Sequence, residues 1–493
     1  MLLDEPLIFE RGAPGRVGWP VAESLAGEPA VPALPPALQR DDSLAGFPEV
    51  SELEVVRHFV RLSQWNYSAA TTLYPLGSCT MKYNPVVNEA LARLAGFAAL
   101  HPLVPDHLAQ GALEVVAGLE AALVAASGLD AVSLQPAAGA QGELLGLLLV
   151  RAYQADRGGA RRRVLIPSSA HGTNPASAAL CGYQVAEVPV DGRGLLPARA
   201  VAAAMDESVA ALMVTNPNTL GLFEEEIEAV AAAVHARGGL VYMDGANFNA
   251  LMGVARPGDM GVDVMQFNLH KTFSTPHGGG GPGAGPVAVR APLAEYLPVP
   301  RLVRTEAGLA WSEEAPKSVG RMRSFYGNFG VLVRAFAYIA RLGAAGLPEV
   351  TRLAVLNANY VRARLQGTYH LPYDTPSLHE CVFSDRHLQD FGVTTLDVAK
   401  RLLDYGFYAP TIYFPLVVKG ALMIEPTETE TKETLDAFVN ALLAIAEEAR
   451  TDPALLRNAP HRARLDETRA ARRPVLRWRP TGTGGFDFRQ TRV

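Results

Sequence analysis

The sequence lacks the features of several protein classes. It contains no run of about 18 consecutive apolar residues, the length that a transmembrane helix needs, so we expect no segment to span a membrane. Its start, MLLDEPLIFERG, is too acidic and has too short an apolar run for a signal or transit peptide. Only three cysteines are present, Cys79, Cys181 and Cys381, and no pair has CxxC spacing. They fit a reducing cytoplasm and predict neither a disulfide framework nor a metal site.

Charge of one sign is not concentrated in any segment either. The formal net charge is -6, and the arginines are scattered along the chain instead of forming one basic stripe. This distribution argues against nucleic acid or an anionic membrane as a main partner. Hydrophobic residues make up 49% of the chain and charged residues 19%, which favours a folded enzyme with a large core over a disordered protein.

From about residue 110 onward, short apolar segments alternate with helical patterns. Strands are predicted at 130–137, 164–167, 185–190, 210–214, 240–243 and 264–267, and helices at 112–126, 142–155, 176–183 and 226–237. Fully apolar strands that alternate with helices are typical of a parallel sheet covered on both faces. The predicted fold class is therefore α/β, with a mainly parallel sheet between helices in the large domain.

A smaller α+β domain is predicted after this alternation. Its expected elements are a long helix, a strand and two further helices, at 330–364, 379–383, 396–405 and 432–450. The two ends, 1–60 and 451–493, show little periodicity, so we expect surface arms that need a partner to bury them. The predicted large domain is then 61–330, and the predicted small C-terminal domain is 331–450.

Lysine is rare in this chain, and one lysine differs from the others. The six lysines are Lys82, Lys271, Lys317, Lys400, Lys419 and Lys432. Lys271 follows the apolar strand 264–267, and a residue just past a parallel strand points into the crevice where such folds bind ligands. A lysine in that place can form a Schiff base with a carbonyl compound. The plain alternative, for an isolated lysine, is a cap on the end of a strand.

Asp244 also follows an apolar strand, 240–243, so its carboxylate is expected at the same edge of the sheet. Pyridoxal 5'-phosphate (PLP) needs an anion beside its pyridine nitrogen, because the protonated ring then accepts the electron pair released when a bond at Cα breaks. The small residues Gly245 and Ala246 leave room for a flat ring. Taken alone, Asp244 is more simply explained as a helix N-cap or a loop aspartate.

Two further segments follow predicted strands. The small residues of 137–142 expose backbone N–H groups at the start of a helix, which is a seat for a phosphate group. This segment is neither a Walker loop nor GxGxxG, so a nucleotide is not indicated. His171 could stack on a cofactor ring or bond to a substrate carboxylate, and a loop histidine with satisfied hydrogen bonds is an equal alternative.

The four segments together favour a PLP enzyme, since each supplies a different group that this cofactor needs. An aminotransferase or another decarboxylase shares the same lysine and aspartate. A non-enzymatic scaffold subunit has no need of the Asp244 and Lys271 pair. A nicotinamide-dependent enzyme needs a glycine fingerprint after the first strand, and the sequence has none.

Longer motifs carry a resemblance to a known family. They are LIFE at 7–10, YPLGSCTMKYNP at 74–85, the loop 139–143, the segments 170–177 and 244–249, HKT at 270–272 and LMIEPTETE at 422–430. They resemble glycine dehydrogenase (decarboxylating), the P-protein of the glycine cleavage system, over nearly the whole chain. The length is similar to that of the split form, in which two subunits replace one fused chain. Because Lys271 is present, the chain resembles subunit 2, which carries PLP.

The resemblance implies a fold, a reaction and partners. The fold is type I of the PLP-dependent transferases. The reaction is decarboxylation of glycine, followed by transfer of the aminomethyl group to the lipoyl group of H-protein. The assembly is a heterotetramer with two copies each of this chain and subunit 1. Lipoylated H-protein and subunit 1 are therefore the expected protein partners, and the cytoplasm is the expected location.

The resemblance also implies roles for individual residues. Lys271, His171 and Asp244 are the expected catalytic residues: Lys271 carries PLP, Asp244 partners the pyridine nitrogen, and His171 covers the ring. Ala246 packs against the other face of the ring. The remaining expected cofactor-binding residues are Gly139, Ala140 and Gln141, near the phosphate, and Asn268 and His270, beside the lysine. No arginine is clearly marked as a clamp for the substrate carboxylate, and Arg321 and Arg323 are the two candidates.

Overall fold

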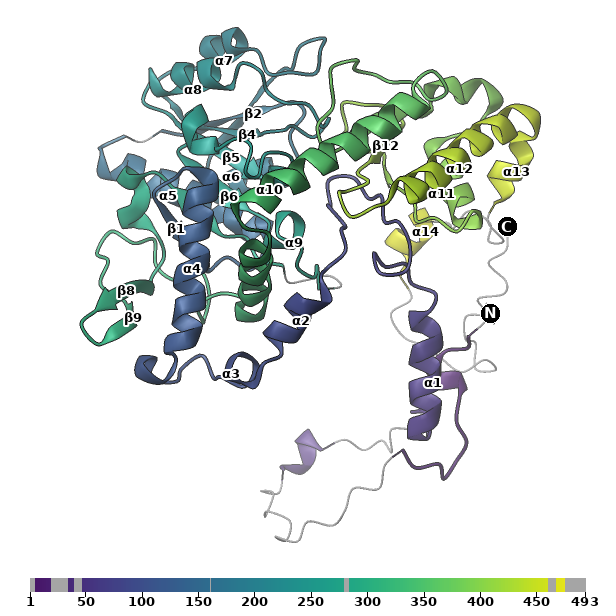
Figure 1. Ribbon diagram of the computed structural model, residues 1–493, viewed down its shortest axis with the longest axis horizontal. Helices are drawn as coiled ribbons and strands as arrows, with labels where there is room; N and C mark the ends of the chain where they lie inside the picture. Colours follow the sequence, from purple (N-terminus) through teal and green to yellow (C-terminus); the bar gives the residue numbers. More distant parts are fainter. Residues whose placement is uncertain are drawn as a thin grey trace. The chain divides into compact units, whose positions relative to one another are not determined.

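The computed structural model describes residues 5–18, 34–39, 47–159, 161–278, 283–459 and 467–474. The chain forms two compact units. One contains the described residues up to Ser68 together with α14 (Glu467–Arg472), and the other is Ala69–Pro460. The second unit contains both large groups of strands (Figure 1). Residues 279–282 of the glycine-rich stretch after Lys271, and residues 475–493 of the predicted C-terminal arm, lie outside the described residues.

The first unit contains a helix where the sequence analysis expects an extended arm. α1 (Glu52–Ser63) begins after Ser51, whose side chain accepts the backbone N–H of Glu54, while Glu54 accepts that of Ser51. This capping box is the sequence signal that identifies the start of the helix. Glu5 forms ion pairs with Arg11 and Arg61, which tie the preceding segment to α1. The predicted boundary at residue 60 therefore falls inside a helix.

The second unit is built on a seven-stranded sheet. Its strand order is β1 (Ala131–Ser133), β7 (Val287–Val289), β6 (Val264–Phe267), β5 (Leu240–Gly245), β4 (Val209–Thr215), β2 (Arg163–Pro167) and β3 (Gln184–Val188). All neighbouring strands are parallel except β7, which is antiparallel to both β1 and β6. The prediction of a mainly parallel sheet is confirmed, and β7 is the strand that it lacks. The other six strands end at one edge of the sheet.

Helices cover both faces of this sheet, because successive strand residues point to opposite sides. α5 (Gly139–Asp156) and α6 (Thr173–Leu180) contribute to the core on the face of Val164 and Tyr242. The opposite face, that of Leu165 and Val241, is covered by four other helices. They are α4 (Gln110–Ser127), α7 (Ala198–Ala204), α8 (Ile227–His235) and α10 (Phe329–Leu365). The predicted two-sided covering is confirmed.

Two of these helices, α4 and α10, are long and apolar enough to cross a membrane by length and composition alone. α4 packs against β1 and α10, and its residues Leu119 and Leu123 are fully buried. α10 is interrupted at Gly343, where φ is 61° and ψ is -172°, and it contains Pro348. Both helices contribute apolar residues to the cores of the second unit.

A three-stranded antiparallel sheet forms the centre of the smaller α+β part. Its strand order is β10 (Cys381–Ser384), β12 (Ala421–Ile424) and β11 (Thr411–Ile412). α11 (Thr395–Asp404) and α12 (Lys432–Thr451) share an apolar core with these strands, and α10 leads into this part of the chain. The strand and the helices predicted here are confirmed within a few residues. The domain boundaries at 330 and 450 stay predictions.

The remaining elements are short. They are α2 (Val86–Ala92), α3 (Ala95–Ala98), α9 (Leu269–Thr272), α13 (Pro453–Asn458) and the hairpin of β8 (Arg301–Thr305) and β9 (Gly308–Ser312). Of these, α9 matters for the site, since it places Lys271 directly after β6.

Candidate active site

A pocket lies at the carboxyl edge of the large sheet, where the predicted segments meet. Its lining residues are Ser78, Gly139, Ala140, Glu143, His171, Thr173, Thr215, Thr219, Asp244, Ala246, Asn247, Asn268, His270 and Lys271. Eight of the nine residues predicted to bind the cofactor are among them, and Gln141 is the exception. A second cavity, between α4 and the aromatic residues Trp311 and Tyr326, contains none of the predicted residues.

Two adjacent strands bring Asp244 and Lys271 to this pocket. β5 and β6 are parallel neighbours, and Gly245 is paired with Phe267. Asp244 is near the end of β5, and Lys271 follows β6 on the first turn of α9. Parallel strands that lie side by side carry the residues after their carboxyl ends to the same place. The sheet therefore supplies a carboxylate and an amine to one pocket.

Asp244 is held by a chain of side-chain amides. Its Oδ1 accepts the Gln266 amide N–H at 2.5 Å and the Ala246 backbone N–H at 2.9 Å. Gln266 in turn accepts from the Asn268 amide at 2.9 Å. Asp244, Gln266 and Asn268 are all buried. Because these bonds occupy Oδ1, the second oxygen of Asp244 is left for a group bound in the pocket, and its direction is fixed.

His171 is connected to Glu143 through Thr173. The Nδ1 atom of His171 accepts the Thr173 backbone N–H at 3.2 Å and lies 2.8 Å from the Thr173 hydroxyl. That hydroxyl donates to Glu143 Oε1 at 3.2 Å. Burial lowers the pKa of His171, so the ring is neutral at pH 7. Burial, together with the charge of Asp244, raises the pKa of Glu143 to about 8, so this carboxyl is also neutral at pH 7.

The start of α5 is the predicted phosphate seat. Gly139 and Ala140 form its first turn and line the pocket. A Cβ atom on Gly139 would collide with the amide nitrogen of Asn268, so only glycine allows this close approach. Gln141 points elsewhere: its oxygen accepts the Ala137 backbone N–H at 2.6 Å, and its amide donates to the Met322 carbonyl at 3.2 Å. Gln141 thus shapes the loop before the helix.

His270 directly precedes Lys271 and lies next to a second histidine. The rings of His270 and His277 are 5.0 Å apart in an edge-to-face arrangement. Burial, with further contributions from His277 and Lys271, lowers the pKa of His270 to about 3. Burial and Lys271 lower the pKa of His277 to about 4. Both rings are therefore neutral at pH 7, and they add no positive charge beside the lysine.

The two arginine candidates do not line the pocket. Arg321 forms an ion pair with Glu313, and Arg323 donates to the side chain of Asn328. In the part of the chain that the structure describes, no arginine is among the lining residues. The described lining therefore offers no guanidinium group to a ligand.

Several lining residues are absent from the sequence-based prediction. Thr215 ends β4, and Thr219 and Asn247 follow β4 and β5 in buried loops. Glu143 has a visible signal, because it is a polar residue in an otherwise apolar face of α5. The same holds for Gln266 in β6, which bonds to Asp244 but does not line the pocket. Ser78 has no such signal, since it comes from a loop far from the sheet in sequence.

The residues present fit PLP on observations of this structure. The buried polar atoms Glu143 Oε2, Thr215 Oγ1 and Asn247 Oδ1 have no partner among the described residues, and all three residues line the pocket. Asp244 has one oxygen left for a protonated ring nitrogen. The backbone of Gly139 and Ala140 offers N–H groups at a helix start to an anion. A flat, polar ring with a phosphate group satisfies these requirements together.

Comparisons with known sequences identify the family. The family model described as "Glycine cleavage system P-protein" matches residues 24–307, and "Glycine dehydrogenase, C-terminal domain" matches residues 350–461. The "Probable glycine dehydrogenase (decarboxylating) subunit 2" of Exiguobacterium sibiricum is 53% identical over 485 residues, which cover 97% of this chain and 98% of the relative. The protein of the same description from Chlorobium chlorochromatii is 54% identical over 479 residues, covering 96% of this chain and 99% of the relative.

This chain belongs to the glycine dehydrogenase (decarboxylating) subunit 2 family. The predicted resemblance is therefore confirmed, and the chain is an enzyme subunit of the glycine cleavage system that acts in glycine decarboxylation. The word subunit in the family's description implies a companion, subunit 1.

Solved structures confirm the fold. A crystal structure of glycine decarboxylase (P-protein) of the glycine cleavage system, in inhibitor-bound form, has a TM-score of 0.68 at 24% identity and covers 80% of this chain and 90% of that chain. A NifS-like protein has a TM-score of 0.60 at 16% identity, covering 76% of this chain and 100% of that chain. A mutant of C-DES, with glycine covalently linked to its PLP cofactor, has a TM-score of 0.59 at 15% identity, covering 76% of this chain and 96% of that chain. The predicted type I fold is confirmed.

Proposed function

We propose that this subunit decarboxylates glycine with PLP held on Lys271 and that the aminomethyl group passes to the lipoyl group of H-protein. The observation that carries the proposal is the placement of Lys271 and Asp244 in one pocket, at the ends of adjacent parallel strands. An amine and a fixed carboxylate on either side of one ring are the two groups that PLP chemistry requires. Family membership supports glycine as the substrate.

The bound cofactor supplies an electron sink for the bond that breaks at the substrate Cα. Asp244 would keep a proton on the ring nitrogen, and its carboxylate is fixed for this task by the Gln266 amide and the Ala246 N–H. His171 and Ala246 both line the pocket and would cover the two faces of the ring. Gly139 and Ala140 would bind the phosphate with their backbone N–H groups. Asn268 and His270 place Lys271 and keep its surroundings neutral.

Glu143 and His171, which line the pocket, are both neutral at pH 7 and so add no charge next to Asp244 and Lys271. Glu143 is protonated at pH 7, because burial and the neighbouring Asp244 raise its pKa to about 8. His171 is neutral, so it covers the ring without adding a positive charge near Lys271. We infer that this distribution of charge favours protonation of the nitrogen in the cofactor ring.

The proposal includes partners and a location. We propose a heterotetramer of two copies of this chain and two of subunit 1, located in the cytoplasm, with lipoylated H-protein as second substrate. Family membership and the presence of free cysteines support these assignments. An assembled complex is expected to exclude water from the pocket, so that the aminomethyl group is transferred and not protonated.

Exchange of isotope-labelled bicarbonate into the carboxyl group of glycine tests the function. We expect exchange when this chain, subunit 1, PLP and lipoylated H-protein are mixed, and none with H-protein that lacks the lipoyl group. No exchange in the complete mixture, although the protein retains PLP, would contradict the proposal. Amino transfer to a 2-oxo acid without H-protein would identify the chain as an aminotransferase instead.

A further inference from the structure

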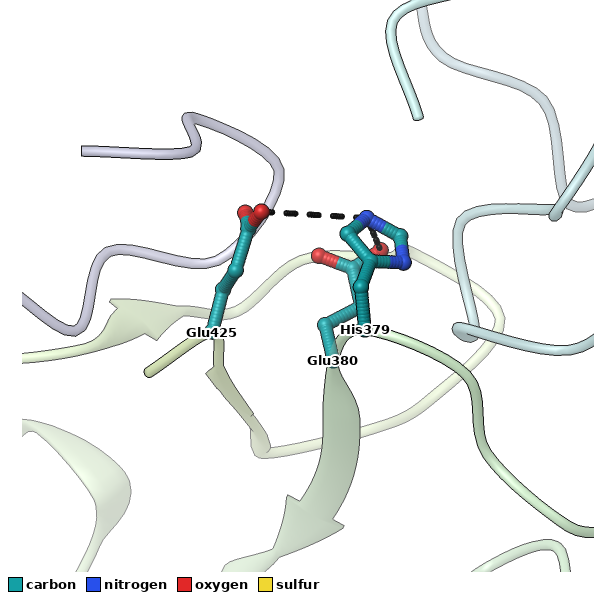
Figure 2. A group of neighbouring side chains, drawn as sticks. All are labelled: His379, Glu380 and Glu425. Atoms are coloured by element: carbon teal, nitrogen blue, oxygen red, sulfur yellow. Dashed lines mark ion pairs between the residues drawn. The ribbon is translucent and has the colours of Figure 1, made fainter. Parts of the chain in front are cut away.

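A buried cluster next to the pocket has no part in the proposed function so far. It consists of His379, Glu380 and Glu425, and each of these residues has no exposed surface. The Nε2 atom of His379 lies 3.9 Å from Glu380 and 3.8 Å from Glu425. Figure 2 shows His379 and Glu380 at the start of one strand of the small sheet and Glu425 at the end of another, with a dashed line from the imidazole to each carboxyl group.

The two carboxyl groups of this cluster bind one turn of the chain. Glu380 accepts the backbone N–H of Ser78 at 2.8 Å. Glu425 accepts the backbone N–H of Thr80 at 2.9 Å and its hydroxyl at 2.6 Å. Burial raises the pKa of Glu425 to about 7 and raises the pKa of Glu380 well above its ordinary value, so the pair does not carry two full charges.

The Ser78–Thr80 turn needs this support because of its backbone. Ser78 has φ 64° and Thr80 has φ 50°, a left-handed conformation that residues other than glycine rarely adopt. Such a conformation persists where the surrounding bonds determine it. Nothing among the described residues accepts a proton from His379 Nδ1, whereas a metal-bound histidine normally donates its second N–H. Support of the turn therefore explains the two carboxyl groups without a metal ion.

The turn carries Ser78 into the pocket beside Lys271. Among the described residues nothing bonds to the Ser78 hydroxyl, so it is available to a ligand. No arginine of the described chain lines the pocket. We propose that Ser78 is a binding residue for the carboxylate of the substrate and that Glu380 and Glu425 are its positioning residues. This inference rests on the proposed function, since it assigns a contact for glycine.

Uncharged hydrogen-bond donors are well suited to bind a substrate carboxylate that leaves as CO2. An arginine clamp stabilises the charged carboxylate in the bound substrate, and this stabilisation is lost as the group becomes neutral in the transition state. A hydroxyl donor orients the carboxylate with less ground-state stabilisation. A turn that is fixed by buried bonds provides this orientation without a salt bridge.

Binding of glycine and of methylamine to the complex with subunit 1 tests the role of Ser78. Methylamine reacts with the lysine-bound cofactor as an amine does but has no carboxylate. Ser78→Gly removes the hydroxyl, and glycine adopts the left-handed conformation readily. We expect its Kd for glycine, followed by the change in visible absorbance, to rise about 10-fold, and its Kd for methylamine to stay within about 2-fold. Equal changes for both amines, or unchanged glycine affinity, would overturn the assignment.

Hydrogen exchange of the chain without cofactor tests the positioning residues. Glu425→Gln replaces one of the two acceptor oxygens that hold Thr80 with a donor, so we expect faster exchange in peptides covering 76–82 and weaker glycine binding. Asp385→Asn is the matched control, because Asp385 accepts the N–H and hydroxyl of Thr395 as Glu425 accepts those of Thr80. It should leave exchange in 76–82 and glycine binding unchanged.

The outcomes separate this inference from the proposed function. Unchanged hydrogen exchange in 76–82 for Glu425→Gln would overturn the positioning role. Faster exchange of this segment in the wild-type chain on addition of a chelator would also overturn it, because the cluster would then bind a metal. A wild-type complex that binds PLP but not glycine contradicts the proposed function and is seen before any variant is made.

Discussion

The large sheet and the small sheet contribute to the pocket in different ways. The large sheet supplies the chemical groups: Asp244, His171 and Lys271 each lie close to the carboxyl end of a strand, and short local segments place them. The small sheet supplies none of the lining residues, yet Glu380 and Glu425 fix a turn that reaches the pocket. The strand ends of the large sheet therefore carry the groups proposed to react. The buried carboxyl groups of the small sheet fix the position of the loop beside them.

The largest expected effect is at the large sheet. Asp244→Asn removes the carboxylate that we propose beside the ring nitrogen, so we expect kcat for bicarbonate exchange to fall on the order of 10²–10³-fold, while the visible absorbance of bound cofactor remains. Asp263→Asn is the control, because Asp263 is a buried carboxylate at the opposite end of the same strands, where it accepts the Val241 N–H. Rates for Asp244→Asn within about 3-fold of wild type would remove Asp244 from its role.

A smaller effect is expected where the two regions are tied together. Lys82 is buried and donates to Glu428 at 2.8 Å, to the Thr272 carbonyl at 2.9 Å and to Asn249 at 2.8 Å. Lys82→Met leaves the buried Glu428 without its positively charged partner, so we expect the free energy of unfolding to fall by about 3 kcal/mol. Chemical denaturation of the isolated chain measures it. A loss below about 1 kcal/mol would mean that water replaces the lysine.

The smallest effect concerns the neutral carboxyl in the pocket. Glu143 ionises near pH 8, beside the charged groups Asp244 and Lys271 and the Thr173 hydroxyl. We expect wild-type kcat to fall as the pH rises through about 8, because two carboxylates then face one ring. Glu143→Gln is neutral at every pH, so its kcat should be within a few-fold of wild type at pH 7 and lack this decline. A decline that persists in the variant would assign it to another group.

The same residue affects stability with a definite sign. The folded pKa of Glu143, about 8, lies above the ordinary value of 4.5, so the folded chain holds its proton more tightly than the unfolded chain does. The free energy of unfolding therefore falls as the pH rises from about 4.5 to 8. Glu143→Gln should reduce this slope, which denaturant titrations at several pH values measure.

The large-sheet half of the site could be predicted from the sequence because its signals are local. The run Val264–Phe267 is a strand with the predicted bounds, and Lys271 follows it directly. β7 is not predicted from the sequence, because its three residues have no pattern that distinguishes them from a loop. The position of Gln141 in its motif suggests a place near the phosphate, but its side chain bonds to the backbone of Ala137 and Met322.

The small-sheet half could not be predicted, because its bonds connect distant parts of the chain. Ser78 and Glu380 are 302 positions apart, and Thr80 and Glu425 are 345 apart. No periodicity or spacing in one sequence relates such residues. The motif 74–85 is typical of the family, but the left-handed backbone at Ser78 and Thr80 is visible only in the fold.

Reduction of the purified chain with borohydride, followed by peptide mapping, tests the central claim most directly. Borohydride fixes PLP to the lysine that carries it. The account predicts a pyridoxyl group on Lys271 alone, and none in Lys271→Ala, in which the visible absorbance of the lysine-bound cofactor is also absent. A pyridoxyl group on Lys82 or on any other lysine of the wild-type chain would contradict it.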